Sequence, residues 1–205
     1  MCEKIEKQIY VHEFPSAIYQ DCLDKFLRIA KNFANFEKFE KFVNVYWDPI
    51  KNQMRNGPNS DNPWKTLVHY DVWTNNMLFH GDKENKLVDS VKFIDFQLLT
   101  LESPLADLVF FVITSSSFEI SNEKLDSIFD LYYDLFISYI QKVNCSQEHY
   151  TREKFDERLK IDALKELPHL VVLIYFITFV ENDESFYAKR VEKLMSFFAY
   201  KKWVD

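Results

Sequence analysis

The sequence predicts an α+β protein that is mostly α, with one small β-hairpin near the middle of the chain. Three observations lead to this class. Segments with apolar residues at helical spacing occupy both ends of the chain. Short apolar runs separated by a polar turn occur only between residues 67 and 94. The 205 residues, 47% of them hydrophobic, can bury one sizeable core, which favours a single domain.

The first part of the chain, residues 1–54, is expected to form leading helices. Residues 16–48 look helical and carry phenylalanines at intervals of three: Phe33, Phe36, Phe39 and Phe42. Such a stripe is typical of the core face of a helix, and less often of a surface for a partner helix. Residues 55–66 are expected to be a loop, because glycine, proline and asparagine are concentrated in residues 55–64.

Residues 67–99 are expected to hold a catalytic loop and the hairpin. Apolar pieces at residues 77–79 and 87–94 predict its two strands, and the polar segment 80–85 predicts the turn. Asn76 then precedes one strand and Asp95 follows the other. Both side chains should therefore lie at the same end of the hairpin.

Residues 100–205 are expected to form a helical bundle. Ser103 is a natural N-cap, and Pro104 suits the first helical position because its missing N–H costs nothing there. The helix that follows is apolar nearly all round apart from Asp107, so it should be central. The serines at 115–117 are expected to be a solvated cap at its end. Helical spacing also predicts helices over residues 122–143, 152–167, 168–180 and 185–203.

Composition restricts the function. A net charge of −7 without a basic run argues against a nucleic-acid binder. Three distant cysteines suggest neither disulfides nor a zinc cluster, so a reducing, cytoplasmic location is expected. The most apolar run, residues 170–180, is shorter than the roughly 20 residues of a membrane span, so a soluble protein is expected. Oligomeric state is left open. With only two glycines the chain has no Gly-rich phosphate loop.

A polar motif points to phosphoryl transfer. In kinase-like sites a base comes first, an Asn follows five positions later, and an Asp after the next strand completes the metal site. Asp71, Asn76 and Asp95 have these types, this order and this spacing. Asp71 is the candidate base, and Asn76 and Asp95 are candidate ligands of Mg²⁺, which prefers oxygen atoms.

The segments "HYDVWTNNMLF", "FIDFQ" and "ESPLADLVFFVITSSS" resemble the ecdysteroid kinase-like and choline-kinase-like family. Its members share the protein-kinase-like fold of aminoglycoside phosphotransferases and choline kinases. The resemblance covers nearly all 205 residues and implies the C-terminal lobe of that fold. It implies that Asp71 is the general base and that Asn76 and Asp95 bind magnesium and, with it, ATP. It also implies that Asp107 supports the catalytic loop by hydrogen bonding to its backbone. His69 and Trp73 are expected to pack rather than react.

Two departures from the family pattern stand out. Tyr70 occupies a position where the family usually has Gly, and would crowd the loop if that position requires a positive φ. The family's N-terminal nucleotide-binding lobe, with its phosphate-binding Lys, is expected to be missing. The chain would then be a fragment, a truncated gene product or a reduced relative.

The expected function is an ATP-dependent small-molecule kinase that acts on an alcohol group, with an ecdysteroid or a similar hydroxyl compound as substrate. Without the missing lobe, activity of this chain alone is doubtful. One alternative is a catalytically inactive kinase-like remnant that acts as a binding or regulatory module. Another is a metallohydrolase that uses His69, Asp71 and Asp95, although such sites usually need more histidines than this chain brings together.

Overall fold

A computed structural model describes residues 16–56, 63–82, 87–181 and 183–204. Most of these residues are helical, and the predicted class, α+β and mostly α, is confirmed. The elements, in order, are α2 (Ser16–Ala30), α3 (Phe36–Asn56), β1 (Thr66–Val68), η1 (Thr74–Asn76), β2 (Met77–Asp82), β3 (Leu87–Phe93), η2 (Phe96–Leu98), β4 (Thr100–Glu102), α4 (Pro104–Ser115), α5 (Asn122–Lys142), α6 (Arg152–Glu181) and α7 (Glu184–Tyr200). None of the described helices is long and apolar enough to cross a bilayer.

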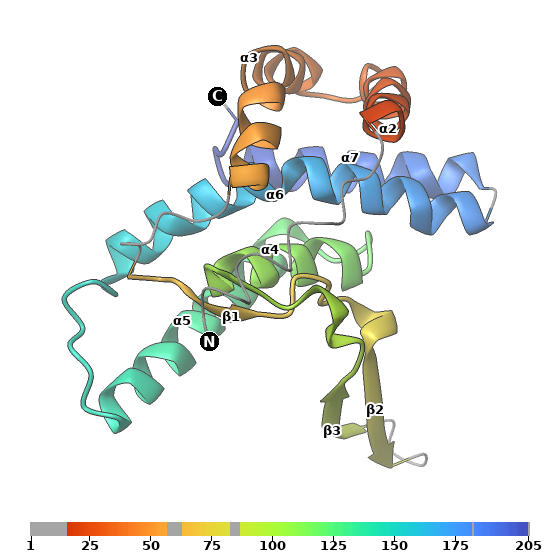
Figure 1. Ribbon diagram of the computed structural model, residues 1–205. Coiled ribbons are helices and arrows are strands. Elements are labelled where there is room, and N and C mark those ends of the chain that lie inside the picture. The colour runs from red at the N-terminus through yellow and green to blue at the C-terminus, as the bar shows by residue number, and fades with distance from the viewer. Residues whose placement is uncertain (1–15, 57–62, 83–86, 182, 205) are drawn as a thin grey trace.

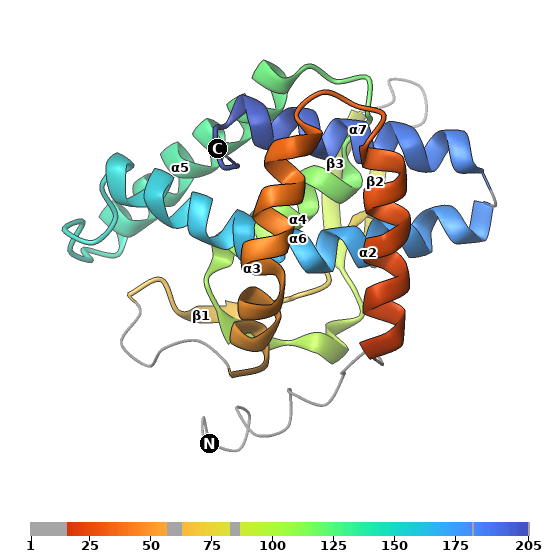
Figure 2. The same cartoon turned by 90° about the horizontal axis from the view of Figure 1, so that it is seen from above.

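The helices form three layers, with α6 and α7 in the middle (Figure 1). On one side, α2 and α3 lie across this pair, as the view from above shows (Figure 2). On the other side lies α4, whose most extensive helix contact is with α6. This position buries α4 between the bundle and the strands, so α4 can hold the segment that precedes the hairpin.

The Phe-rich segment forms two helices rather than one. The chain turns between α2 and α3, where Asn35 adopts a φ of 67°. Asn tolerates this left-handed conformation better than most residues, so it is a suitable place for the break. The core prediction is confirmed, because Phe39 and Phe42 are buried and Phe33 and Phe36 pack against the core. Helix α3 ends at Asn56, so the first two residues of the predicted loop are helical, and residues 57–62 lie outside the described residues.

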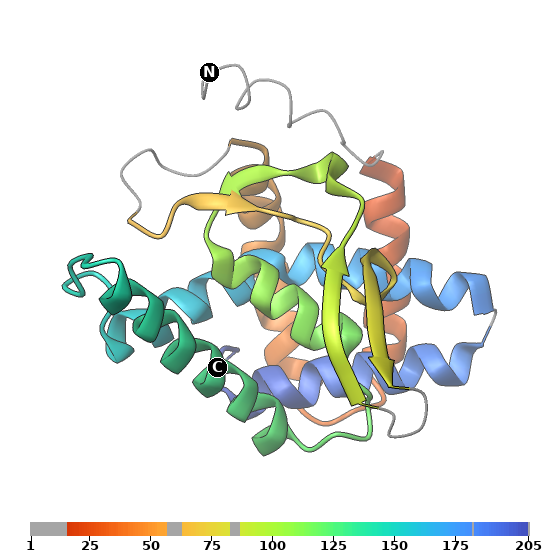
Figure 3. The same ribbon diagram turned by 90° about the horizontal axis from the view of Figure 1, so that it is seen from below.

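The strands form two small antiparallel sheets. The predicted hairpin is β2–β3, and a second pair, β1–β4, was not predicted. Strand β2 continues through Asp82, so half of the predicted turn belongs to the strand. The register shifts beside Gly81, where a Cβ atom would lie 2.2 Å from the Leu87 carbonyl oxygen. Only glycine fits this close approach. The view from below shows the hairpin beside α4 (Figure 3).

Helix α4 begins as predicted: Ser103 is the N-cap, its Oγ accepts a hydrogen bond from Leu105 N at 3.3 Å, and Pro104 is the first helical residue. The expected boundary at Pro168 is wrong, because α6 runs through it without interruption. Proline removes one helical hydrogen bond. Burial of Leu167 and Leu170 at 0% exposure offsets this loss.

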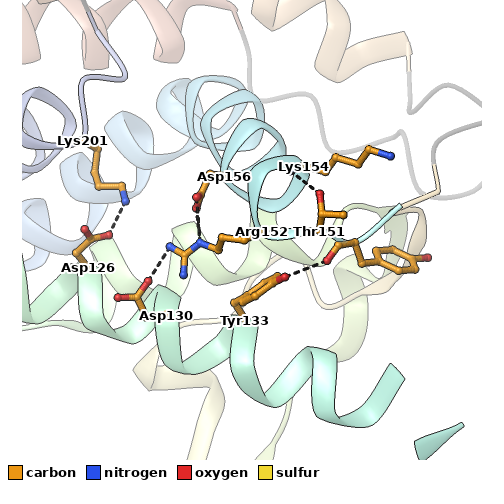
Figure 4. A network of polar contacts seen from close by, with 9 residues as sticks. Asp126, Asp130, Tyr133, Thr151, Arg152, Lys154, Asp156 and Lys201 are labelled. Atoms are coloured by element: carbon orange, nitrogen blue, oxygen red, sulfur yellow. Dashed lines mark hydrogen bonds and ion pairs between the residues drawn. The ribbon is translucent and has the colours of Figure 1, made fainter. Parts of the chain in front are cut away.

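A polar network joins α5 to α6 and to the end of α7 (Figure 4). At its centre, Arg152 of α6 contacts Asp130 of α5 at 2.7 Å and Asp156 at 3.0 Å. Lys201, after α7, pairs with Asp126 of α5. These contacts add to the apolar packing of α5, whose Phe129 is fully buried and stacks on Phe197 of α7.

Candidate active site

The candidate catalytic loop connects β1 to β2 and brings Asp71 and Asn76 together. Asn76 lies at the end of η1, is 8% exposed and directs its side-chain amide at Asp71. Asn76 Nδ2 donates to Asp71 Oδ2 at 2.7 Å and to the Asp71 carbonyl oxygen at 2.9 Å. Because Nδ2 is engaged in this way, Oδ1 is the Asn76 atom that could ligate a cation.

Asp95 is tied to this loop through the residue before it. Ile94 N donates to the Asn76 carbonyl oxygen at 3.0 Å, and the Ile94 carbonyl oxygen lies 2.8 Å from His69 Nε2. Asp95 itself has a φ of 62°, is exposed, and makes no side-chain capping bond to η2. Its carboxylate therefore stands at the hairpin end that carries Asn76 and is not used as a helix cap.

Asp107 holds the other end of the loop. Its Oδ2 accepts from His69 N at 2.7 Å, and its Oδ1 accepts from Tyr70 N at 2.9 Å. This is the backbone contact expected from the sequence. Burial raises the pKa of Asp107 to about 6, against the two N–H groups, which favour the charged form, and the nearby carboxylate of Glu166 raises it further.

His69 lies in the scaffold of the loop. It is 7% exposed, and its ring packs against Phe93 and Phe96, at centroid distances of 6.2 and 4.9 Å. A carbonyl oxygen can only accept, so His69 Nε2 carries the proton and donates to Ile94. His69 thereby joins the loop to the end of β3.

Trp73 and the serine run support the loop from the side of α4. Trp73 is partly buried against the hydrophobic core. Thr74 N donates to Ser115 Oγ at 3.0 Å, and Arg190 donates to the carbonyl oxygen of Ser116 at 2.5 Å. The expectation of a merely solvated cap is therefore wrong for Ser115, whereas Ser116 is the C-cap of α4. Helix α4 holds the loop at both of its ends, through Asp107 and Ser115.

The backbone of Tyr70 has a positive φ, the conformation that would favour glycine at this position of the motif. Its φ is 66°, which costs a non-glycine residue about 1–2 kcal/mol. Its ring stacks on His169 of α6, with centroids 5.4 Å apart and an interplanar angle of 26°. On the same helix Glu166, 4% exposed, accepts from His169 Nδ1 at 3.1 Å.

Sequence reasoning missed Glu166 and His169, and it expected Ser115 to be only part of a solvated cap. The spacing of Glu166 and His169 is compatible with an ion pair on a helix, but nothing in the sequence connects that pair to a loop about 100 residues earlier. Only the packing of α4 on α6 places them near Tyr70.

The residues at the hairpin end fit a magnesium–nucleotide complex. Magnesium usually takes one or two carboxylates, keeps several waters and binds the phosphates of the nucleotide. Asp95 offers an exposed carboxylate and Asn76 an amide oxygen. Among the residues that the structure describes, no group of three or more His, Cys, Asp and Glu side chains could hold a metal ion. The metallohydrolase alternative thus lacks a ligand cluster in this part of the chain.

Comparison with known proteins agrees with this kinase-like arrangement. A model of the ecdysteroid kinase-like family matches residues 1–145, which include the catalytic loop, the hairpin and α4. The chain belongs to the ecdysteroid kinase-like family. Searches of curated proteins and of solved structures found no match.

Proposed function

We propose that this chain belongs to an ATP-dependent phosphotransferase that phosphorylates an alcohol group of a small molecule. The observation that carries the proposal is the pairing of Asp71 Oδ2 with Asn76 Nδ2 at 2.7 Å, beside the strand end that bears Asp95. Family membership supports the same reaction class.

In the proposed mechanism, Asp71 orients the acceptor hydroxyl and takes its proton. Asn76 donates to Oδ2, so Oδ1 of Asp71 is the atom that faces the hydroxyl. The hydroxyl oxygen bonds to the γ-phosphorus, the bond from that phosphorus to the β–γ bridging oxygen breaks, and ADP leaves. Asn76 Oδ1 and the Asp95 carboxylate would hold magnesium, which neutralises phosphate charge when bound.

The substrate class follows from the family alone: an ecdysteroid or a comparable small hydroxyl compound. We place the reaction in the cytoplasm, where ATP is available. The two described cysteines, Cys22 and Cys145, are free, which suits a reducing compartment.

A binding or regulatory module without turnover is the second candidate. The strained backbone of Tyr70, next to the proposed base, favours it because that position is usually glycine in the family pattern. The two candidates differ in whether phosphate reaches an acceptor.

The test is phosphoryl transfer from magnesium–ATP to a panel of ecdysteroid and other alcohols, followed by mass spectrometry of the acceptor. Asp71→Asn should lower kcat about 100-fold or more with little change in nucleotide affinity, because the base acts in the transition state. Asp95→Ala should instead weaken magnesium–nucleotide binding. Asp89→Asn, an exposed change in the hairpin, is the matched control and should leave both unchanged.

Transfer that Asp71→Asn leaves intact would refute the assigned base. Magnesium–ATP binding without transfer to any alcohol would favour the binding module.

A further inference from the structure

The side chain of Tyr70 stacks on a residue of α6. His169 stacks on two rings, Tyr70 and Phe110 of α4, at centroid distances of 5.4 and 4.3 Å and an interplanar angle of 26° in both cases. Glu166, one turn earlier on α6, fixes the imidazole through the 3.1 Å contact to Nδ1. His169 is thus restrained by the helix pair α4–α6 before it meets Tyr70.

The backbone of Tyr70 is under a separate restraint. Its N–H and that of His69 both bond to the carboxylate of Asp107, and its φ of 66° turns the chain toward Asp71. Glycine takes this conformation without penalty, whereas tyrosine does so only when its surroundings hold it there. Stacking on a fixed ring supplies such a hold on the side chain.

We infer that His169, oriented by Glu166 and Phe110, is a positioning residue for Asp71: it keeps Tyr70 in the left-handed conformation that presents the carboxylate of Asp71 to Asn76. This inference rests on the proposed function for its meaning. Its test does not, because the geometry of the loop can be measured without nucleotide, substrate or turnover.

Two signals report on the loop directly. Hydrogen exchange of the His69 and Tyr70 amides reports how often the loop leaves Asp107. The side-chain NH₂ resonances of Asn76 report its bond to Asp71. Exchange of backbone amides within α4 serves as the reference for unfolding of the whole protein.

The experiment is a double-mutant cycle between residues 70 and 169. His169→Ala should speed exchange of the His69 and Tyr70 amides about tenfold relative to α4, and should shift the Asn76 side-chain resonances. In a Tyr70→Gly background the same substitution should change neither signal appreciably, because glycine takes this conformation without penalty and has no ring for His169 to restrain. His149→Ala, which changes an exposed histidine after α5, is the matched control.

His169→Ala leaves Glu166 without its partner, so Glu166→Gln/His169→Leu provides a second variant that keeps volume and removes the buried charge. This variant should change the loop signals in the same way as His169→Ala, while the melting temperature changes little. Unchanged signals in this variant, or equal changes with Tyr and with Gly at position 70, would overturn the inference. If the signals behave as expected and no alcohol is phosphorylated, the positioning stands and the proposed reaction fails.

Discussion

Tyr70 shows how a single backbone angle determines what a position accepts. With φ at 66°, a side chain of any size carries a conformational cost, and the contacts of the tyrosine ring help to offset it. Alanine at this position would keep the cost and lose the ring, whereas glycine would lose both. Alanine usually gives a more stable protein than glycine, and this order of stability should be reversed at position 70.

We predict that Tyr70→Gly is more stable than Tyr70→Ala by about 1 kcal/mol. Urea unfolding of the two variants at neutral pH measures this difference. At Ala34, which is exposed in the turn before Asn35 and does not have a positive φ, Ala→Gly should not be stabilising and serves as a control. Equal stability of the two variants at position 70 would mean that the loop has a different backbone conformation.

Asp107 makes the stability of the folded protein depend on pH. Its folded pKa of about 6 lies above the ordinary value of 3.8, mainly because of burial, so the folded protein holds this proton more tightly than the unfolded chain does. The resulting stabilisation is complete below about pH 4 and is lost as the pH rises to about 6.

We predict that the stability advantage of the wild type over Asp107→Asn shrinks by about 1–2 kcal/mol between roughly pH 4.5 and 6.5. Urea titrations of both proteins across this range measure the difference. An advantage that grows with pH would show that the two backbone N–H groups outweigh burial at this carboxylate.

At the scale of elements, α6 carries two Arg–Asp pairs with the same i,i+4 spacing and very different burial. Arg152 and Asp156 have side chains 43% and 48% exposed. Arg158 and Asp162 have side chains 14% and 1% exposed, and Arg158 also reaches Glu102 of β4 at 3.3 Å. The buried pair therefore ties α6 to the small sheet.

We predict that Arg158→Met lowers the free energy of unfolding by about 3 kcal/mol, because it leaves Asp162 buried without its cation. Arg152→Met, the same change in the exposed pair, should cost about 1 kcal/mol or less. Thermal or urea unfolding of both variants measures the loss of stability. Similar losses in the two variants would contradict the prediction that the buried pair contributes more.

Elements were predictable where their signals are local. Ser103 and Pro104 predict the start of α4, and the structure confirms it. The pairing of β1 with β4 was missed because three-residue strands more than 30 residues apart in the chain leave no periodic signal. Helix α6 passes through Pro168 because burial of its neighbours in the core outweighs one lost hydrogen bond.

The candidate site likewise contains residues that can be found from local sequence and contacts that depend on tertiary packing. Asp71, Asn76 and Asp95 could be found from type and spacing, and Asp107 from the family resemblance, because all lie within one short stretch of the chain. The contacts of Tyr70 with His169, and of Thr74 with Ser115, depend on how α4 and α6 pack. Packing of this kind cannot be deduced from a local sequence pattern.

At the scale of the whole molecule, exposed apolar side chains gather on the hairpin and just after it. They are Leu78, Phe79, Leu87, Val88, Val91, Phe93, Ile94 and Phe96, each at least 37% exposed. Contiguous apolar surface favours association, and a two-stranded sheet also offers free edges.

We predict that the protein self-associates at high concentration and that Phe79→Lys, which alters the cross-strand partner of Val91, weakens this association. Sedimentation velocity over a concentration series measures it. Ile161→Lys on α6, at a comparable exposure of 48% against 51% for Phe79, is the control. A purely monomeric wild type, or an equal effect of the two variants, would argue against the hairpin as the associating surface.

In the proposed reaction, Asp71, Asn76 and Asp95 act on one magnesium-bound phosphate. Manganese, a paramagnetic substitute for magnesium, tests this arrangement through broadening of nuclear resonances in the presence of ATP, which is detectable even when binding is weak. We predict broadening centred on the Asn76 side chain and the Asp95 amide, lost in Asp95→Ala and retained in Asp89→Asn. Broadening centred elsewhere, or unchanged in Asp95→Ala, would contradict the proposed site.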